Sequence, residues 1–141
     1  MSNLPLIQLL IDFGLIVLIW MVQLIIYPSF LRYESHSLGK WHLTYTGRIT
    51  VIVAPLMIAQ IALASYLLIN TASYHYLEII ALGLIILNWL LTFSIFIPFH
   101  EKIDKDPTDR KVQRRLVQSN WMRVVLFCLT FICHVFYYLL V

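Results

Sequence analysis

Charged residues are scarce in this chain, and lysine and arginine are missing from most of it. Charged side chains make up 12% of the 141 residues and hydrophobic ones 61%, whereas a soluble domain carries about 25% charged residues. All ten lysines and arginines lie in two windows, Arg32–Arg48 and Lys102–Arg123. These windows flank apolar runs, where membrane topology and anionic lipid head groups favour basic residues. The formal charge of +3 therefore does not indicate a nucleic-acid partner.

Cysteine is also rare, and the two that occur are Cys128 and Cys133. Their spacing contains no C-x-x-C, which argues against a thiol redox enzyme, and no C-x-x-C-H, which argues against covalently attached haem. We therefore expect two buried structural thiols. The N-terminus lacks the basic residues of a cleavable signal peptide, so the first apolar run is expected to remain as a membrane span.

Four long apolar runs make up most of the chain, at about residues 4–27, 49–69, 76–99 and 121–141. A helix needs about 20 apolar residues to cross the hydrocarbon core of a bilayer. Helices are the natural assignment, because backbone groups in lipid must be hydrogen-bonded within the protein. The chain is too short for two domains. The sequence therefore predicts a single domain, residues 1–141, with four transmembrane helices.

The positions of the basic residues predict the orientation of these helices. The segments 28–45 and 100–119 carry positive charge, and the connection 70–75 has no lysine or arginine. Basic loops remain in the cytoplasm, so both termini are expected outside it. We predict an all-α, antiparallel four-helix bundle that crosses the cell membrane several times. Residues 108–117 are expected either in a solvated loop or as an amphipathic helix that runs into the fourth span.

Polar residues inside the apolar runs recur at helical spacing. Polar side chains are costly in a bilayer and usually face the interior of a bundle. They serve either as interhelical hydrogen bonds, each worth about 0.6 kcal/mol, or as the wall of a polar pocket. The predicted inward stripes, each on one face of a helix, are Asp12, Ile16, Ile19, Gln23 and Tyr27; Tyr45, Arg48, Ile52 and Pro55; Asn88, Thr92 and Phe99; and Asn120, Arg123, Phe127, Thr130 and His134.

Asp12 and His134 are expected to form an outer polar pair. Asp12 follows the start of the first run by eight residues, and His134 precedes the last residue by seven. At about 1.5 Å per residue, both lie about 10–12 Å from the same end of the bundle. A carboxylate beside an imidazole satisfies two costly groups at once. The pair is either structural or part of a proton relay.

A larger polar group gathers at the predicted cytoplasmic ends of the runs. His36, His42 and His100 are candidate ligands of a transition metal, because neutral imidazole suits iron, copper and zinc. Their spacings match no known ligand signature, so hydrogen-bonded interfacial histidines are the alternative. Non-covalent haem is a second candidate cofactor. The cofactor therefore stays open at this point.

Four residues of this group are predicted to be catalytic: His42, His100, Arg48 and Arg123. The histidines would act as acid and base or as ligands, and the arginines would stabilise a developing oxyanion. Each arginine also begins a span from the cytoplasmic side, which makes it a topology anchor as well. The residues predicted to orient a substrate are Tyr45, Asn88, Thr92 and Asn120.

The last 55 residues carry a pattern shared with a known family. Thr92 precedes Pro98 by six residues, the polar His100 follows two later, and Trp121 precedes Arg123 at the start of the fourth run. In this pattern, in length and in topology, the chain resembles the anthrone oxygenase-like family of small four-helix membrane proteins. The resemblance implies oxygenation of a lipophilic aromatic substrate.

Two functions from different classes follow. The first is a small membrane oxidoreductase or oxygenase whose pocket opens at the cytoplasmic leaflet and takes a lipophilic substrate. The second is a non-enzymatic membrane subunit, or a lipid- or haem-binding protein, in which the same polar residues hold the bundle together. Membrane lipid is an expected partner in both cases.

Overall fold

The structure is a computed structural model, and it describes residues 3–70 and 75–140. Within these ranges the chain is helical and contains no strand. The elements are α1 (Leu4–Met21), the π-helical turn η1 (Val22–Ile26), α2 (Tyr27–Phe30), α3 (Ser35–Asn70), α4 (His75–Leu91), the π-helical turn η2 (Thr92–Phe96), α5 (Ile97–Lys105) and α6 (Arg110–Leu140). They join into four continuous segments that are long and apolar enough to cross a membrane: Leu4–Phe30, Ser35–Asn70, Tyr76–Lys105 and Arg110–Leu140.

The helices extend well beyond the predicted apolar runs. Helix α3 has 36 residues, which at about 1.5 Å per residue is about 54 Å, longer than the hydrocarbon core of about 30 Å. Hydropathy detects only the part of a helix that lies in lipid. It therefore predicts loops where the structure has polar extensions of the helices. The expected loops 28–45 and 100–119 shrink to residues 31–34 and 106–109. Most of the 108–117 segment belongs to α6, and residues 71–74 of the expected 70–75 connection lie outside the described residues.

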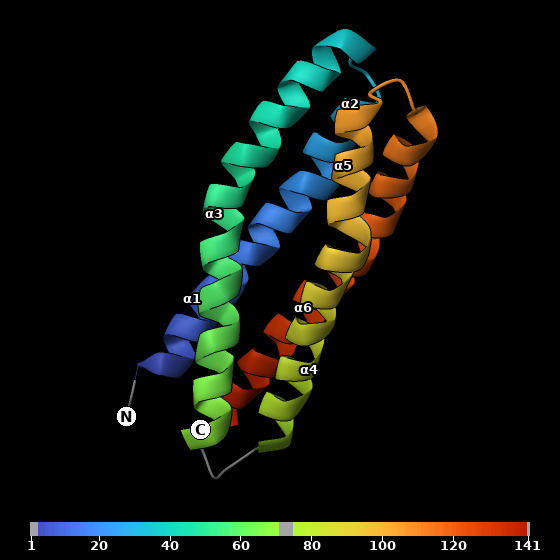
Figure 1. The fold of residues 1–141 in the computed structure, drawn as a ribbon. Coiled ribbons are helices and arrows are strands. Elements are labelled where there is room, and N and C mark those ends of the chain that lie inside the picture. The colour runs from blue at the N-terminus through green and yellow to red at the C-terminus, as the bar shows by residue number, and fades with distance from the viewer. Residues whose placement is uncertain (1–2, 71–74, 141) are drawn as a thin grey trace.

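The four segments pack side by side around a shared interior (Figure 1). Helix α1 contacts helices α3 and α6, and helix α4 also contacts α3 and α6. The loops 31–34 and 106–109 lie at one end, which we call the loop end, and Leu4 and Leu140 lie at the opposite end (Figure 1). The two basic windows therefore meet: the Arg110 guanidinium donates hydrogen bonds to the Phe30 carbonyl at 3.0 Å and the Tyr33 carbonyl at 2.6 Å.

Each π-helical turn precedes a proline. Pro28 follows η1 by two residues and Pro98 follows η2 by two residues. Proline has no N–H and its ring crowds the carbonyl four residues earlier, and a wider turn relieves both problems. Neither proline ends its helix at once: α2 continues to Phe30, and α5 continues to Lys105.

Large apolar side chains cover much of the outer surface of all four segments. Examples are Ile25, Val51, Leu90 and Leu139, which are 64%, 74%, 59% and 71% exposed. A soluble monomer rarely exposes so much contiguous apolar surface, whereas lipid accepts it. Length, composition and this outer surface together describe a multi-pass membrane protein. Cys128 and Cys133 are free and only partly buried, so the expectation of two buried thiols was too strong.

Candidate functional site

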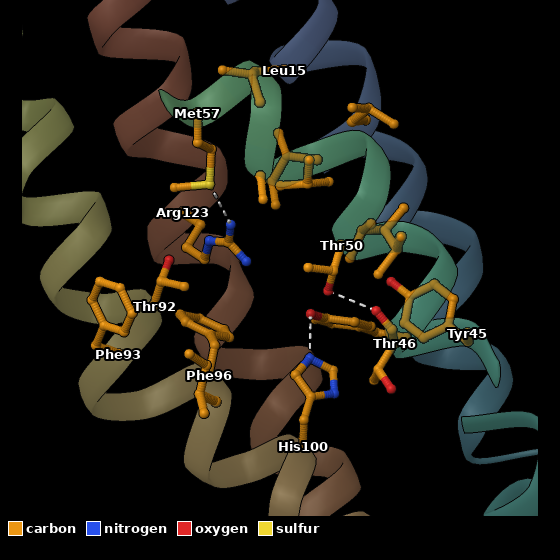
Figure 2. Close-up of a pocket in the computed structure, with 18 of the residues that line it drawn as sticks. Leu15, Tyr45, Thr46, Thr50, Met57, Thr92, Phe93, Phe96, His100 and Arg123 are labelled. Carbon is orange, nitrogen blue, oxygen red and sulfur yellow. Dashed lines mark hydrogen bonds between the residues drawn. The ribbon is translucent and has the colours of Figure 1, made fainter. Parts of the chain in front are cut away.

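A cavity of about 350 Å³ lies between the segments in the half of the molecule nearer the loop end (Figure 2). This volume is at the small end of the range for ligand pockets, about 300–1,000 Å³. Most lining side chains are apolar or aromatic, and all four segments contribute. The polar lining residues are Tyr27, Tyr45, Thr46, Thr50, Thr92, His100, Glu101, Asp104 and Arg123.

Four side chains form a continuous chain of hydrogen bonds at the loop end of the cavity. Asp104 Oδ1 is 2.6 Å from His42 Nδ1. His42 Nε2 is 2.9 Å from His100 Nδ1, and His100 Nε2 is 3.0 Å from the Tyr27 hydroxyl. We call these four residues the relay. The two imidazoles are stacked, with ring centroids 5.0 Å apart, and His42 is completely buried.

The chemistry of the groups gives the relay one direction. An ionised Asp104 carboxylate only accepts hydrogen bonds, so His42 Nδ1–H donates to it. His42 Nε2 of the neutral ring then accepts from His100 Nδ1–H. His100 Nε2 in turn accepts from the Tyr27 O–H. Every proton in this arrangement points from the buried Tyr27 towards Asp104, whose side chain is 27% exposed at the loop end.

Arg123 lies in the wall of the same cavity, further from the loop end. The residue is only 8% exposed, and its guanidinium points into the open space in Figure 2. Its Nε donates to Asn88 Oδ1 at 3.3 Å, and Nη2 is 4.0 Å from the Met57 sulfur. The guanidinium carbon lies 4.9 Å from the Phe96 ring centroid and 5.8 Å from that of Phe127.

The charge of Arg123 has no anionic partner among the described residues. Contact with two aromatic rings stabilises a desolvated cation by about 2 kcal/mol, which is less than the several kcal/mol that burial of an ion costs. Trp89 also lines the cavity, and its buried indole N–H has no hydrogen-bond partner within residues 3–70 and 75–140. These unsatisfied groups are donors, so an occupant of the cavity that supplies acceptors or negative charge would complement them.

The structure does not bring the three predicted metal ligands together. In the part of the chain that the structure describes, no three histidine, cysteine, aspartate or glutamate side chains are placed to hold a metal ion. His36 is exposed near the start of α3. Both ring nitrogens of His42 and both of His100 already take part in hydrogen bonds.

The structure brings only some of the predicted site residues to the cavity. Tyr45, Thr92, His100 and Arg123 line it, although the Thr92 hydroxyl donates to the Asn88 carbonyl at 2.9 Å. His42 stands behind His100 in the relay. Asn88 and Asn120 contact other side chains instead: Asn88 accepts from Arg123, and Asn120 donates to Gln23 Oε1 at 3.0 Å.

Arg48 does not reach the cavity and is exposed on α3. The expected stripe through Arg48 and Ile52 has the wrong phase, because Ile52 is 52% exposed. The face of α3 that lines the cavity passes instead through Tyr45, Ile49, Val53 and Met57. Aliphatic and aromatic residues cover most of this helix, so hydropathy alone did not distinguish its inner face.

Two relay members were not predicted as site residues. Asp104 was grouped with a solvated loop, although it follows His100 by four residues and so lies on the same face of α5. Tyr27 was placed on an inward stripe without a role. The H-x-x-x-D spacing was the signal that pointed to Asp104.

Asp106, in the loop that follows α5, takes no part in the relay. Hydrogen bonds from the Thr108 hydroxyl and backbone N–H lower the pKa of this exposed carboxyl.

A second polar cluster lies towards the end that holds Leu4 and Leu140. Asp12 and His134, expected at equal depth, are in direct contact, with Oδ2 and Nδ1 2.5 Å apart. Glu78, which was not predicted, lies on the other side of the imidazole at 3.7 Å. We call Gln8, Asp12, Gln60, Glu78 and His134 the outer cluster. None of them lines the cavity.

No family model, curated protein or solved structure matches this chain.

Proposed function

We propose that this protein is a membrane-embedded enzyme that removes a proton from a lipophilic substrate bound in the cavity. In this proposal the four segments form an antiparallel bundle in the cell membrane, and both termini face away from the cytoplasm. The exposed basic residues at the loop end, among them Lys40, Arg48, Lys102 and Arg115, support this orientation. The cavity then lies in the cytoplasmic half of the bilayer.

The observation that carries the proposal is the directed relay. A substrate with an acidic O–H or C–H gives its proton to the Tyr27 oxygen, while Tyr27 gives its own proton to His100 Nε2. His100 passes its Nδ1 proton to His42, and His42 passes its Nδ1 proton to Asp104. The substrate becomes an anion and Asp104 becomes neutral, so charge and protons balance. Asp104 is partly exposed and can release the proton to water.

Arg123 supplies the charge that such an anion needs. A cation fixed in a low-dielectric cavity stabilises developing negative charge far more than the same cation does in water. The guanidinium is positioned before any substrate binds: Asn88 accepts a hydrogen bond from Nε, and the guanidinium carbon lies over the Phe96 and Phe127 rings. Of the two arginines predicted to stabilise an oxyanion, the proposal assigns this role to Arg123 alone.

We propose oxygenation as the reaction that follows this deprotonation. The electron-rich anion forms a carbon–oxygen bond with dioxygen, which gives a peroxide anion. Breakage of the O–O bond, with loss of the remaining C–H proton, then leaves a carbonyl group on the substrate and releases the second oxygen atom as hydroxide. The resemblance to the anthrone oxygenase-like family implies such a reaction on a lipophilic aromatic substrate. His42 and His100 then serve proton transfer rather than ligation of a metal or haem.

A probe that reports its own ionisation tests the proton transfer. 2-Naphthol absorbs at longer wavelength as the anion than as the neutral form, and it can be titrated into the purified protein in detergent micelles. The wild-type protein is expected to hold part of the probe as the anion at a pH where the free probe is neutral. Asp104→Asn should remove most of the anion signal, and Asp106→Asn, in the exposed loop, should leave it unchanged. Binding of the probe without ionisation by the wild type contradicts the proposal.

A non-enzymatic lipid-binding subunit is the second candidate function. It is favoured by the apolar lining and by Phe93 and Ile97, which line the cavity and are 59% and 40% exposed, so the cavity borders the lipid-facing surface. On this hypothesis 2-methoxynaphthalene, which has no acidic proton, binds as tightly as 2-naphthol. The affinity of each probe for the Asp104→Asn variant should then equal its affinity for the wild type.

A further inference from the structure

The outer cluster joins all four membrane segments through buried polar side chains. Gln8 and Asp12 come from α1, Gln60 from α3, Glu78 from α4 and His134 from α6. Each of these residues is at most 1% exposed. Three of them are ionisable, and no lysine or arginine is paired with them within the described residues. The charge of the cluster therefore depends on protons alone.

The hydrogen bonds determine the state of Asp12. Its Oδ1 accepts from Gln60 Nε2 at 2.7 Å and from Gln8 Nε2 at 3.3 Å. Its Oδ2 lies 2.5 Å from His134 Nδ1. Three donors converge on the carboxylate, which is the environment of an ionised group. His134 Nδ1 therefore carries a proton.

Glu78 is in the opposite situation. Both of its carboxylate oxygens are buried and have no hydrogen-bond partner among the described residues, and the same holds for His134 Nε2 and Gln8 Oε1. Glu78 Oε2 lies 3.7 Å from His134 Nε2, which is too far for a hydrogen bond. With Asp12 and Glu78 both ionised, the cluster would hold two buried negative charges and at most one positive charge, on His134. Such burial is very costly.

We propose that the outer cluster is a proton-binding site, in which Glu78 takes up and releases a proton beside the His134–Asp12 pair. The ligand is a proton rather than a metal ion. The Asp12 carboxylate already accepts hydrogen bonds from three donors, and no cluster of three potential metal ligands occurs in the described part of the chain. Glu78 lies in the first turn of α4.

This site is separate from the relay. An apolar layer formed by Leu15, Ile19, Met57, Val124 and Phe127 lies between the two. The outer cluster therefore exchanges its proton with the end opposite to Asp104. Among the described residues, other groups that face Glu78 or its pair are Gln8 on α1, Gln60 on α3 and Cys133 on α6. None of these is a cation that could replace the proton.

Infrared difference spectroscopy on the purified protein tests the proposal, because a protonated buried carboxyl group has a C=O band that a carboxylate lacks. The band is expected to appear as the pH is lowered from alkaline to mildly acidic, and to be absent in Glu78→Gln. Glu34→Gln, the same change on an exposed glutamate at the loop end, should leave it unchanged. Circular dichroism at each pH confirms that the helices persist.

A second variant decides the result if Glu78→Gln does not fold. Glu78→Asp keeps a carboxyl group in a different position, so the band should persist at a shifted frequency. A band that is the same in wild type, Glu78→Gln and Glu78→Asp overturns the proposal. The absence of a Glu78-dependent band at every pH at which the protein stays folded overturns it as well.

Discussion

The cavity and the outer cluster lack opposite kinds of partner. Beside the cavity, the Trp89 indole N–H has no hydrogen-bond partner, and the charge of Arg123 has no anionic partner among the described residues. In the outer cluster the unsatisfied groups are mainly acceptors, namely the Glu78 carboxylate and the Gln8 carbonyl. Beside the cavity, whose volume is about 350 Å³, there is room for a ligand that could pair with Arg123 and Trp89. In the outer cluster, which contributes no residue to the cavity, we propose that a proton satisfies Glu78.

The largest expected effect lies in the outer cluster. Asp12→Ala removes the group that accepts from His134, Gln60 and Gln8, and leaves three buried donors without a partner. Removing one partner of such a buried, hydrogen-bonded pair costs about 3–5 kcal/mol. Thermal unfolding in detergent micelles should therefore start at a clearly lower temperature. Asp106→Ala, on an exposed loop residue, is the control, and an equal loss in both variants would show that the outer cluster does not hold the helices together.

The corresponding change beside the cavity should have little effect on stability. The double variant Arg123→Met, Asn88→Leu removes a buried cation together with its hydrogen-bond partner, and removing both partners is nearly neutral or stabilising. We expect a free energy of unfolding within about 1 kcal/mol of the wild type, but loss of the 2-naphtholate signal. A large loss of stability would mean that Arg123 serves the fold rather than a ligand.

A smaller effect is expected at the buried end of the relay. Tyr27→Phe removes one hydrogen bond, which contributes about 0.5–1.5 kcal/mol, and keeps the ring that packs against Phe30. We therefore expect a large fall in the fraction of anionic 2-naphthol but only a small fall in the free energy of unfolding. The ratio of anionic to neutral 2-naphthol measures the first and thermal unfolding the second. Tyr33→Phe, on a residue that is 39% exposed, should change neither.

The smallest effect concerns a carboxyl group outside both regions. Thr108 hydrogen bonds lower the pKa of Asp106 from its ordinary value of 3.8. A carboxyl with a depressed pKa in the folded state favours folding above its unfolded pKa, and this contribution is lost as the pH falls through the folded pKa. Thr108→Ala should move the pKa of Asp106 back towards 3.8, as followed by carboxyl-carbon NMR, without any change in the relay or the outer cluster. An unchanged pKa would show that the Thr108 hydroxyl contributes little.

Hydrophobic periodicity predicted all four membrane helices, but it predicted the inner face correctly for α6 and wrongly for α3. Helix α6 carries several polar residues among apolar ones, and its inner face was read correctly through Asn120, Arg123, Thr130 and His134, all of which are buried. Helix α3 has few polar markers in its apolar part, and Arg48 was placed on the wrong face. A helix in lipid is apolar on its outer side as well as its inner side, so hydropathy does not mark the interior unless polar residues do.

The sequence by itself determined that the chain forms four helices long enough to span a membrane, that its basic residues gather at one end, and that Asp12 and His134 share a depth. These properties depend on apolar length and on residue counts along single helices. Only the tertiary structure decided that Asp104 completes a relay with His42 and that Glu78 joins the outer cluster. Those contacts link residues that are 62 positions apart, for His42 and Asp104, and 56 positions apart, for Glu78 and His134. They depend on helix rotation and on the two π-helical turns, which local sequence patterns do not specify.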